Sequence, residues 1–182
     1  MRKRLIHSGM AGLVLVLCLI LPAKAGLTHL QAARIEAAFL VRFSRYVEWP
    51  METFRNENDA IVIGILGRDP FGSTINRAAR GFRANGRNLE IIRLQKITDA
   101  GKCHILFIAP DQAVNLNRIR AALGHRPVLL VSDMDEFLNR GGMFRFLFIN
   151  NKLRFDINLV HCHDNGLEIS SKLLRIAHQV TK

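Results

Sequence analysis

Three short, almost uninterrupted runs of apolar residues constrain the fold of this chain more than any other feature. They cover residues 61–66, 103–108 and 128–131, and only His104 breaks their apolar character. A strand with one solvent-facing side alternates apolar and polar residues, whereas a strand that is buried on both faces is apolar throughout. Helical and turn patterns separate the runs, as in sheets whose parallel strands are joined by helices. We therefore expect a buried, mostly parallel sheet.

Four other segments have helical patterns. Residues 28–48 carry apolar side chains at three- and four-residue steps, which is typical of an amphipathic helix. Trp49-Pro50 should end this helix, because the residue before a proline is disfavoured in the α region. Ser73 is suited to cap a second helix that runs to about residue 80. We expect two more helices over residues 111–123 and 135–139, and another strand over residues 89–94.

The last forty residues change character. Residues 143–149 and 152–158 are strand-like, and Asn150-Asn151 between them is a credible two-residue hairpin turn, since asparagine tolerates positive φ. Residues 167–180 should close the chain as a helix that starts after Ser170 or Ser171. Together these patterns predict an α/β fold: a single layered domain with a mixed, mostly parallel sheet flanked by helices, followed by a C-terminal β-hairpin and helix.

The first 25 residues have the layout of a secretory signal peptide. A basic start at residues 2–4 precedes an uncharged, mostly apolar stretch at residues 9–21, and Ala23-Lys24-Ala25 offers small residues at the two positions that a signal peptidase reads. The apolar stretch is too short for a spanning helix, which needs about 20 residues. We expect cleavage after Ala25, a single mature domain over residues 26–182, and export to the periplasm of a Gram-negative bacterium.

The overall charge suggests nucleic-acid binding only until the signal peptide is set aside. The chain of 182 residues has 26 Lys and Arg against 15 Asp and Glu, a formal net charge of +11. Four of the basic residues and no acidic one lie in the first 25, so the mature net charge is +7. The remaining basic residues are scattered, which argues against a nucleic-acid partner. No later segment is long and apolar enough to span a membrane.

One turn has the spacing of a phosphate-binding loop without its chemistry. Residues 67–74 follow a predicted strand, precede a predicted helix and contain glycines at 67 and 72. The lysine that should follow the second glycine is missing, and Pro70 removes one backbone donor. Hydrolysis of a nucleoside triphosphate is therefore not expected. A weaker anion contact at Gly72, Ser73 and Thr74 is one interpretation, and an ordinary strand–turn–helix connection is the other.

Histidines and cysteines suggest a metal site only weakly. His161-Cys162-His163-Asp164 contains metal-ligand types, but two histidines two apart do not share a helix face and no established zinc spacing is present. His104 is expected to be a hydrogen-bonded core residue. The chain has no nucleophile elbow and no marked carboxylate pair, so we expect no catalytic residue, no metal, no cofactor and no enzyme activity.

Two cysteines remain after removal of the signal peptide, Cys103 and Cys162. An even count in an oxidising compartment makes a disulfide between them plausible. The alternative is two separate buried thiols, since cysteine is among the residue types that are most often buried. The sequence leaves both alternatives open.

Short motifs spread over the mature chain resemble a known family. They occur in order at residues 37–43, 46–50, 63–67 with 69–72, 85–87, 103–108, 131–133, 140–143, 154–159 and 169–174. The chain is similar to the YfiR-like family of periplasmic regulators. The resemblance implies a binding protein without catalysis that restrains a membrane-bound diguanylate cyclase by contacting its periplasmic sensor domain, and so controls cyclic di-GMP and biofilm growth. It also implies a homodimer and, in some members, intramolecular disulfides that stabilise the fold; Cys162 does not stand at a position typical of those members.

A recognition surface is expected in the C-terminal region. By strand alternation Arg154, Asp156 and Asn158 share one face, while Lys172 and Arg175 are three apart and neighbours on a helix surface. We expect these five residues to contribute to partner or ligand recognition. The alternative is that they are ordinary solvated charges on a half-exposed hairpin and helix.

Two other functions compete with a regulator of a cyclase. One is a periplasmic small-molecule or anion-binding module that feeds a sensor kinase or a transporter, with the 67–74 turn as its site. The other is a periplasmic metal-binding protein that uses His161, Cys162 and His163.

Overall fold

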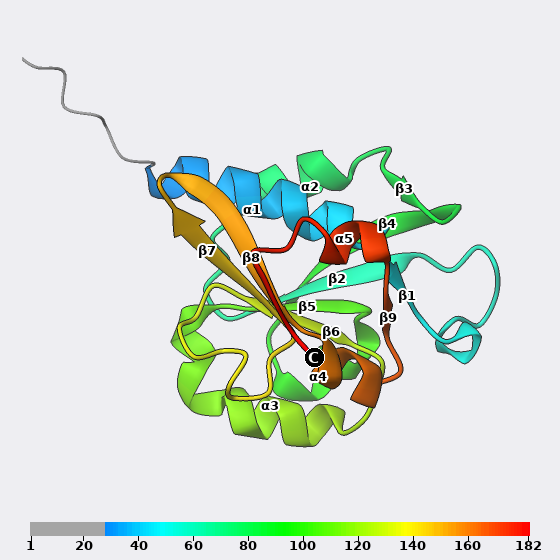
Figure 1. Ribbon diagram of the computed structural model, residues 1–182. Helices are drawn as coiled ribbons and strands as arrows, with labels where there is room; N and C mark the ends of the chain where they lie inside the picture. Colours follow the sequence, from blue (N-terminus) through cyan, green and yellow to red (C-terminus); the bar gives the residue numbers. More distant parts are fainter. Residues whose placement is uncertain (1–27) are drawn as a thin grey trace, which may run out of the picture.

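The three apolar runs form neighbouring parallel strands in the middle of one sheet. They are β2 (Ile61–Leu66), β5 (Ile105–Ile108) and β6 (Leu129–Ser132). In register, Ile63 lies opposite Ile105, which in turn lies opposite Leu129. The structure is a computed structural model that describes residues 28–182 (Figure 1). The predicted signal peptide lies outside the described residues.

The complete sheet has eight strands in the order β10-β8-β7-β6-β5-β2-β4-β3. Neighbouring strands are parallel except at two antiparallel pairs, β7–β8 and β3–β4. The other five strands are β3 (Arg83–Ala84), β4 (Arg87–Leu94), β7 (Phe144–Ile149), β8 (Lys152–Asn158) and β10 (Gln179–Thr181). The prediction of a single α/β domain with a mixed, mostly parallel sheet is confirmed.

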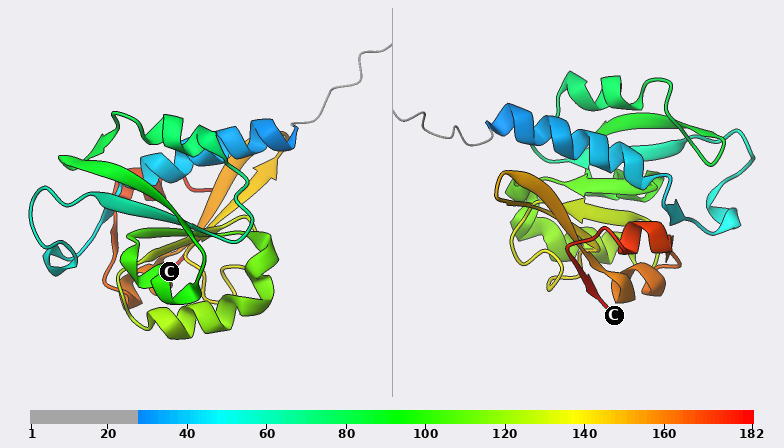
Figure 2. Two further views of the ribbon diagram at one scale, coloured as in Figure 1. Left: turned by 180° about the vertical axis from the view of Figure 1, so that it is seen from behind. Right: turned by 45° about the horizontal axis from the view of Figure 1, so that its top comes forward.

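Helices cover both faces of this sheet. α1 (His29–Phe43) and α2 (Ser73–Ala79) lie on one face and α3 (Leu116–Leu123) lies on the other (Figures 1 and 2). The short elements are α4 (Leu159–Asp164), α5 (Ser171–Leu174) and the 3-10 helices η1 (Met51–Thr53), η2 (Ile97–Lys102) and η3 (Pro110–Asn115). Among residues 28–182, no helix has the length and hydropathy needed to cross a bilayer.

The first helix is shorter than its sequence pattern predicts. It begins at a capping box in which Thr28 and Gln31 exchange hydrogen bonds, and it ends at Phe43 rather than at residue 48. Val47–Glu48 instead forms β1, which pairs antiparallel with β9 (Glu168–Ile169). A pairing with residues more than a hundred positions away overrides the local helical preference, which is only a weak prior.

The C-terminal hairpin is confirmed, whereas the closing helix is wrong. Asn150 and Asn151 have φ of 51° and 58°, the left-handed pair that a two-residue hairpin turn requires. Within residues 167–180, only one helical turn, α5, follows the capping Ser170. The chain then adds β10 parallel to β8. The helix predicted over 135–139 is also wrong, because those residues form turns in which Glu136 has a φ of 57°.

Aromatic side chains hold α1 against the hairpin. The Phe43 ring packs on Phe144, Phe146 and Phe155 at centroid distances of 5.0, 5.6 and 5.2 Å. These phenylalanines lie on one face of β7 and β8, and by strand alternation the polar residues of the two strands lie on the opposite face. The fold therefore leaves a polar strand face in the C-terminal half of the sheet.

Candidate partner-binding site

Asp156 lies at the centre of that polar face and is almost completely buried, with 3% of its side chain exposed. Its Oδ2 accepts a hydrogen bond from Arg145 Nη2 at 2.6 Å, and its Oδ1 lies 2.8 Å from His178 Nδ1. Arg145 is the direct cross-strand neighbour of Asp156 on β7. His178 comes from the segment that leads into β10, where Gln179 lies beside Asp156. One carboxylate thus joins β7, β8 and the last strand of the chain.

The burial of the Asp156 carboxylate has an electrostatic cost that its partners must offset. Moving a carboxylate out of water costs several kcal/mol, a cost that an ion pair offsets only when the geometry is good and further hydrogen bonds are made. Asp156 meets both conditions, because each oxygen has its own partner. Arg145 meets them less completely: its Nε is buried and has no hydrogen-bond partner among the described residues.

The cluster opens into a cavity of about 470 Å³. Asp156 and Arg145 form part of its wall, and Asn158 continues the same face of β8. Gln179 and Thr181 of the neighbouring strand β10 lie beside Asp156 and Asn158. Asn158 also caps α4, because its Oδ1 accepts from the backbone N–H of His161. Exposed Glu136, from the turn after β6, completes the rim. The cavity is polar and is lined by residues of three strands, the turn after β6 and His161 of α4.

The structure brings together only two of the five predicted recognition residues. Asp156 and Asn158 share the cavity, whereas Arg154 lies farther along β8 toward the hairpin tip, opposite Leu147. The Arg154 guanidinium is exposed and donates to the carbonyl of Leu153. Lys172 and Arg175 lie exposed at α5, which is beside β9 in Figure 1, and neither lines the cavity. The role of all five residues in recognition stays a prediction.

Sequence reasoning missed Arg145 and His178 as partners of Asp156. The signal for Arg145 was present, because a two-residue turn at Asn150-Asn151 fixes the register and places residue 145 opposite residue 156. His178 had no comparable signal. It approaches Asp156 only because β10 pairs with β8, and a three-residue edge strand leaves almost no pattern in the sequence.

The 67–74 turn has its own internal anion. Asp69 Oδ1 accepts the backbone N–H groups of Phe71 and Gly72 at 2.7 and 3.2 Å, so a carboxylate of the chain occupies those donors. The hydroxyls of Ser73 and Thr74 accept from Arg77. The interpretation as a strand–turn–helix connection fits this arrangement, and an external anion at Gly72, Ser73 and Thr74 stays a prediction.

The two cysteines are both buried, and both are free thiols in the structure. Cys103 precedes β5, whereas Cys162 lies on α4 after β8, and β6 and β7 lie between those strands. Three strand spacings separate β5 from β8 by roughly 14 Å. Burial raises the pKa of each thiol to about 12, with the nearby carboxylate of Asp99 as a second cause for Cys103. The described residues contain no group of three or more His, Cys, Asp or Glu side chains placed so that they could hold one metal ion, and His161 Nδ1 lies 3.0 Å from the carbonyl of Gly142.

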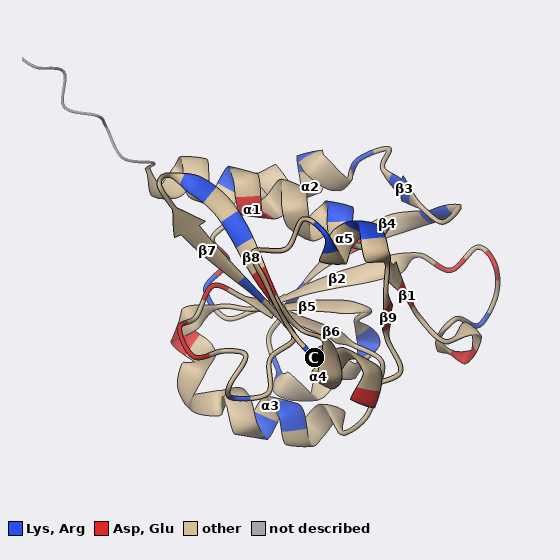
Figure 3. Cartoon of the chain, in the orientation of Figure 1, with Lys and Arg blue, Asp and Glu red and all other residues tan. Residues whose placement is uncertain are grey.

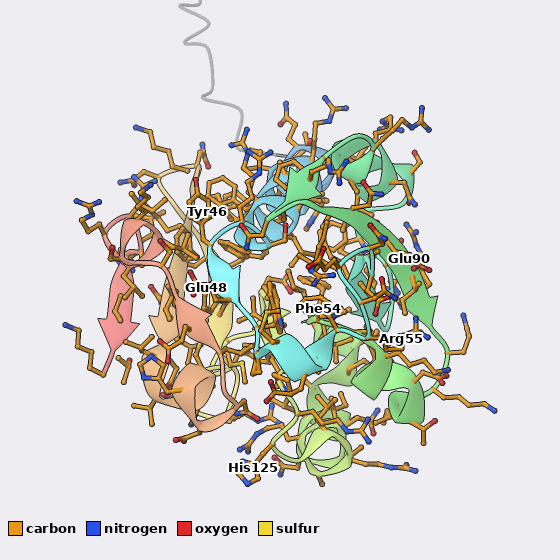
Figure 4. All side chains as sticks on the ribbon, turned by 90° about the vertical axis from the view of Figure 1, so that its right-hand side faces the viewer. Tyr46, Glu48, Phe54, Arg55, Glu90 and His125 are labelled. Atoms are coloured by element: carbon orange, nitrogen blue, oxygen red, sulfur yellow. The ribbon has the colours of Figure 1, made fainter. Side chains whose placement is uncertain are left out.

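His104 is a core residue with a hydrogen bond, as predicted. Its Nδ1 accepts from the backbone N–H of Val62 at 3.0 Å, and its ring stacks on Phe54 at 4.7 Å. Phe54 lies on the segment between β1 and β2, beside Arg55 (Figure 4). Burial, followed by the positive charge of Arg87, lowers the pKa of His104 to about 4, so the ring is neutral at neutral pH.

Glu36, on α1, also has a strongly shifted pKa. It lies on the inner side of α1 with 5% of its surface exposed. Burial, and second the negative charge of Asp133, raise its pKa to about 7. Asp133 directly follows β6, so the two carboxyl groups come from α1 and from the end of that strand. We therefore expect the stability of the fold to depend on pH as Glu36 titrates.

Lys and Arg are spread over several helices, strands and loops instead of forming one basic face (Figure 3). Asp156 lies among this scattered charge with two partners of its own.

Comparisons with known proteins extend over most of the chain. A family model described as YfiR/HmsC-like matches residues 33–178. No curated protein matches the sequence. Among solved structures, a conserved domain protein from Vibrio cholerae O1 biovar eltor is similar with a TM-score of 0.50 and 12% identity, over 68% of this chain and 55% of that one. The ABC domain in complex with L-Trp from Streptococcus pneumonia is similar with a TM-score of 0.55 and 11% identity, over 79% of this chain and 60% of that one. At these identities the two structures show the fold alone, and this chain spans little more than half of each.

Proposed function

The chain belongs to the YfiR/HmsC-like family, and from this membership we propose that it is a binding protein without catalysis that restrains an inner-membrane diguanylate cyclase by contacting the cyclase's periplasmic sensor domain. Membership by itself supports the broader statement, a periplasmic regulator of cyclic di-GMP signalling. The match over residues 33–178 is the observation that carries the proposal, because it includes nearly every described element from α1 to α5.

The polar cavity beside β8 is the part of the surface that best suits such a contact. Its wall is rigid, since Asp156 fixes Arg145 and the segment before β10 in one arrangement. Its rim offers Glu136 and Gln179 as exposed polar groups. A rigid polar wall with free groups at the rim suits recognition of a partner side chain, since little conformational freedom is lost on binding.

A binding experiment with two matched variants tests the proposal. The mature chain is titrated by calorimetry into the purified periplasmic domain of the membrane diguanylate cyclase encoded nearest to its gene. Glu136→Arg reverses a charge at the rim of the cavity. We expect at least about tenfold weaker binding, because a reversed charge turns an attraction across the interface into a repulsion between like charges. Glu90→Arg makes the same change on β4, at the other end of the sheet, and should leave binding unchanged (Figure 4).

Cells supply the functional readout. Deleting the gene should raise cyclic di-GMP and biofilm formation, and the wild-type chain and Glu90→Arg should reverse this while Glu136→Arg does not. Unchanged cyclic di-GMP after deletion, together with no detectable binding to the cyclase domain, would contradict the proposal. The homodimer that the resemblance implies stays a prediction, which light scattering of the mature chain tests.

A further inference from the structure

A second cavity, of about 780 Å³, lies at the opposite half of the sheet from Asp156. It is formed where β2 and β4 end, and residues of η3 and α3 close its other side. β4 lies on one side of β2 and β5 on the other, so the order of strands reverses direction at β2. In open α/β sheets, ligands bind in the crevice at the carboxyl ends of the strands next to such a reversal.

The loops after β2 and β5 approach each other closely beside the cavity. Gly67, directly after β2, has a φ of 97°, and a Cβ atom there would lie 2.6 Å from Asp111 Oδ1. The backbone N–H of Arg68 donates to the same oxygen at 2.9 Å. The loops after β2 and β5 are therefore held in contact, and this contact forms one end of the cavity, which Gly67 and Gln112 line.

The lining combines apolar and cationic groups. Buried Leu66 and Leu94 provide an apolar base. Arg93, Lys96 and Arg118 line the same cavity from three different segments, with Asp69 as the only carboxylate. Arg93 is paired with Asp69 at 3.0 Å. The side chains of Lys96 and Arg118 are exposed and make no hydrogen bond or ion pair with any residue from 28 to 182.

We propose that this cavity is a binding site for a small organic anion, a carboxylate or phosphate that carries an apolar group. Lys96 and Arg118 bind the anionic group, and the apolar group packs against Leu66 and Leu94. Arg93 is neutralised by its pairing with Asp69. Lys96 and Arg118, which have no such partner, therefore determine that the cavity prefers an anionic ligand. This site does not use the N–H groups of Phe71 and Gly72, which Asp69 occupies, and it does not depend on the proposed function.

Two fluorescent probes that differ in charge test the proposal on the mature chain. 1-Anilinonaphthalene-8-sulfonate carries an anionic group on an apolar ring system, and N-phenyl-1-naphthylamine is its neutral counterpart. We expect saturable binding of the sulfonate with one site per chain and weaker binding of the neutral probe. Benzoate and phenyl phosphate distinguish the two kinds of anionic group, and displacement of the sulfonate by either one supports the site.

Charge and space are then varied separately. Lys96→Glu with Arg118→Glu should weaken sulfonate binding at least about tenfold, since hydrogen bonds to charged groups are the strong ones, and should leave the neutral probe unchanged. The control, Arg34→Glu with Lys152→Glu, makes the same net change at exposed positions on α1 and β8. Ala122→Trp, on the α3 side of the cavity, should block both probes by filling space. Equal sulfonate affinity in the wild type and the Lys96→Glu, Arg118→Glu variant, or displacement by neither anion, overturns the proposal.

Discussion

The two halves of the sheet place their polar chemistry in different locations. In the parallel half, β5 and β6 are buried along their whole length, and polar side chains gather in the loops after the strands. In the C-terminal half, β8 carries Asp156 in mid-strand, because only one face of the hairpin packs against α1. Polar groups in the loops are free to bind a ligand, whereas a polar group inside a strand must first be satisfied by the fold. We therefore expect substitution of a polar strand residue to cost more stability than substitution of a polar loop residue.

The largest effect should come from a comparison of two Asp–Arg pairs. Asp156→Ala leaves Arg145 without its counter-ion in a mostly buried position, and breaking such a pair costs about 3 to 5 kcal/mol. Asp69→Ala breaks the more exposed pair with Arg93 and two turn hydrogen bonds, for which we expect about 1 kcal/mol. Urea unfolding of both variants measures the difference. Equal losses would show that the two halves do not differ in this way.

The next effect concerns Glu36, at the boundary between the halves. Its pKa is about 7 in the folded protein and 4.5 when unfolded, so the folded state binds the proton more tightly. Its contribution to stability is complete below about pH 4.5 and is lost as the pH rises toward 7. Between pH 5 and pH 8 we expect the wild type to lose roughly 2 to 3 kcal/mol relative to Glu36→Gln. His104 titrates with the opposite sign but contributes equally to both proteins, so the difference between their urea curves reports Glu36 and its interaction with Asp133. Parallel pH profiles would contradict the assignment.

A smaller effect is expected from Gly67 in the parallel half. Gly67→Ala introduces a left-handed alanine and a clash with Asp111, for about 2 kcal/mol of destabilisation. Gly86→Ala, in the turn between β3 and β4, is the matched control, since Gly86 also has positive φ, 82°, but open space around its Cβ position. Thermal unfolding should rank Gly67→Ala below Gly86→Ala, and the reverse order would show that the contact between the two loops is unimportant.

The smallest effect separates the two interpretations of the cysteines. Cys103 lies in the parallel half and Cys162 beyond β8, so a bridge would join the halves. From their burial as free thiols we expect no reaction with a thiol reagent in the native protein and two thiols per mature chain after denaturation without reductant. Reductant should then change the free energy of unfolding by less than about 0.5 kcal/mol. A count of zero in the denatured, unreduced protein would establish the disulfide instead.

The sequence was sufficient for the parts of the fold that local patterns determine. Continuous apolar runs identified β2, β5 and β6, and Asn150-Asn151 identified the hairpin. The pattern failed where distant pairing decides the structure: residues 47–48 pair with 168–169 instead of extending α1, and residues 179–181 pair with β8 instead of extending a helix. Both errors come from segments of two or three residues, which are too short to show a period.

The residues of the candidate site divide in the same way, into those that local patterns predict and those that depend on distant contacts. Asp156 was identified from strand alternation, and hairpin register was enough to add Arg145. His178 and the rim residue Glu136 required the three-dimensional structure, because each comes from a segment for which the sequence pattern predicted a helix. Lys172 and Arg175 were predicted to act together with Asp156 because they were placed on a long closing helix. That helix is only one turn in the structure.

The pairing of β1 with β9 has a consequence for how the chain folds. Neighbouring strands of the large sheet are close in sequence, so most of that sheet can assemble progressively along the chain. The pairing of Val47 with Ile169 instead closes a loop of more than a hundred residues. Closing so long a loop costs more chain entropy than forming any strand pair of the eight-stranded sheet. We therefore expect this two-stranded ribbon to form last during folding and to open first in the native protein, with backbone amides that exchange hydrogen faster than those of β2 and β5.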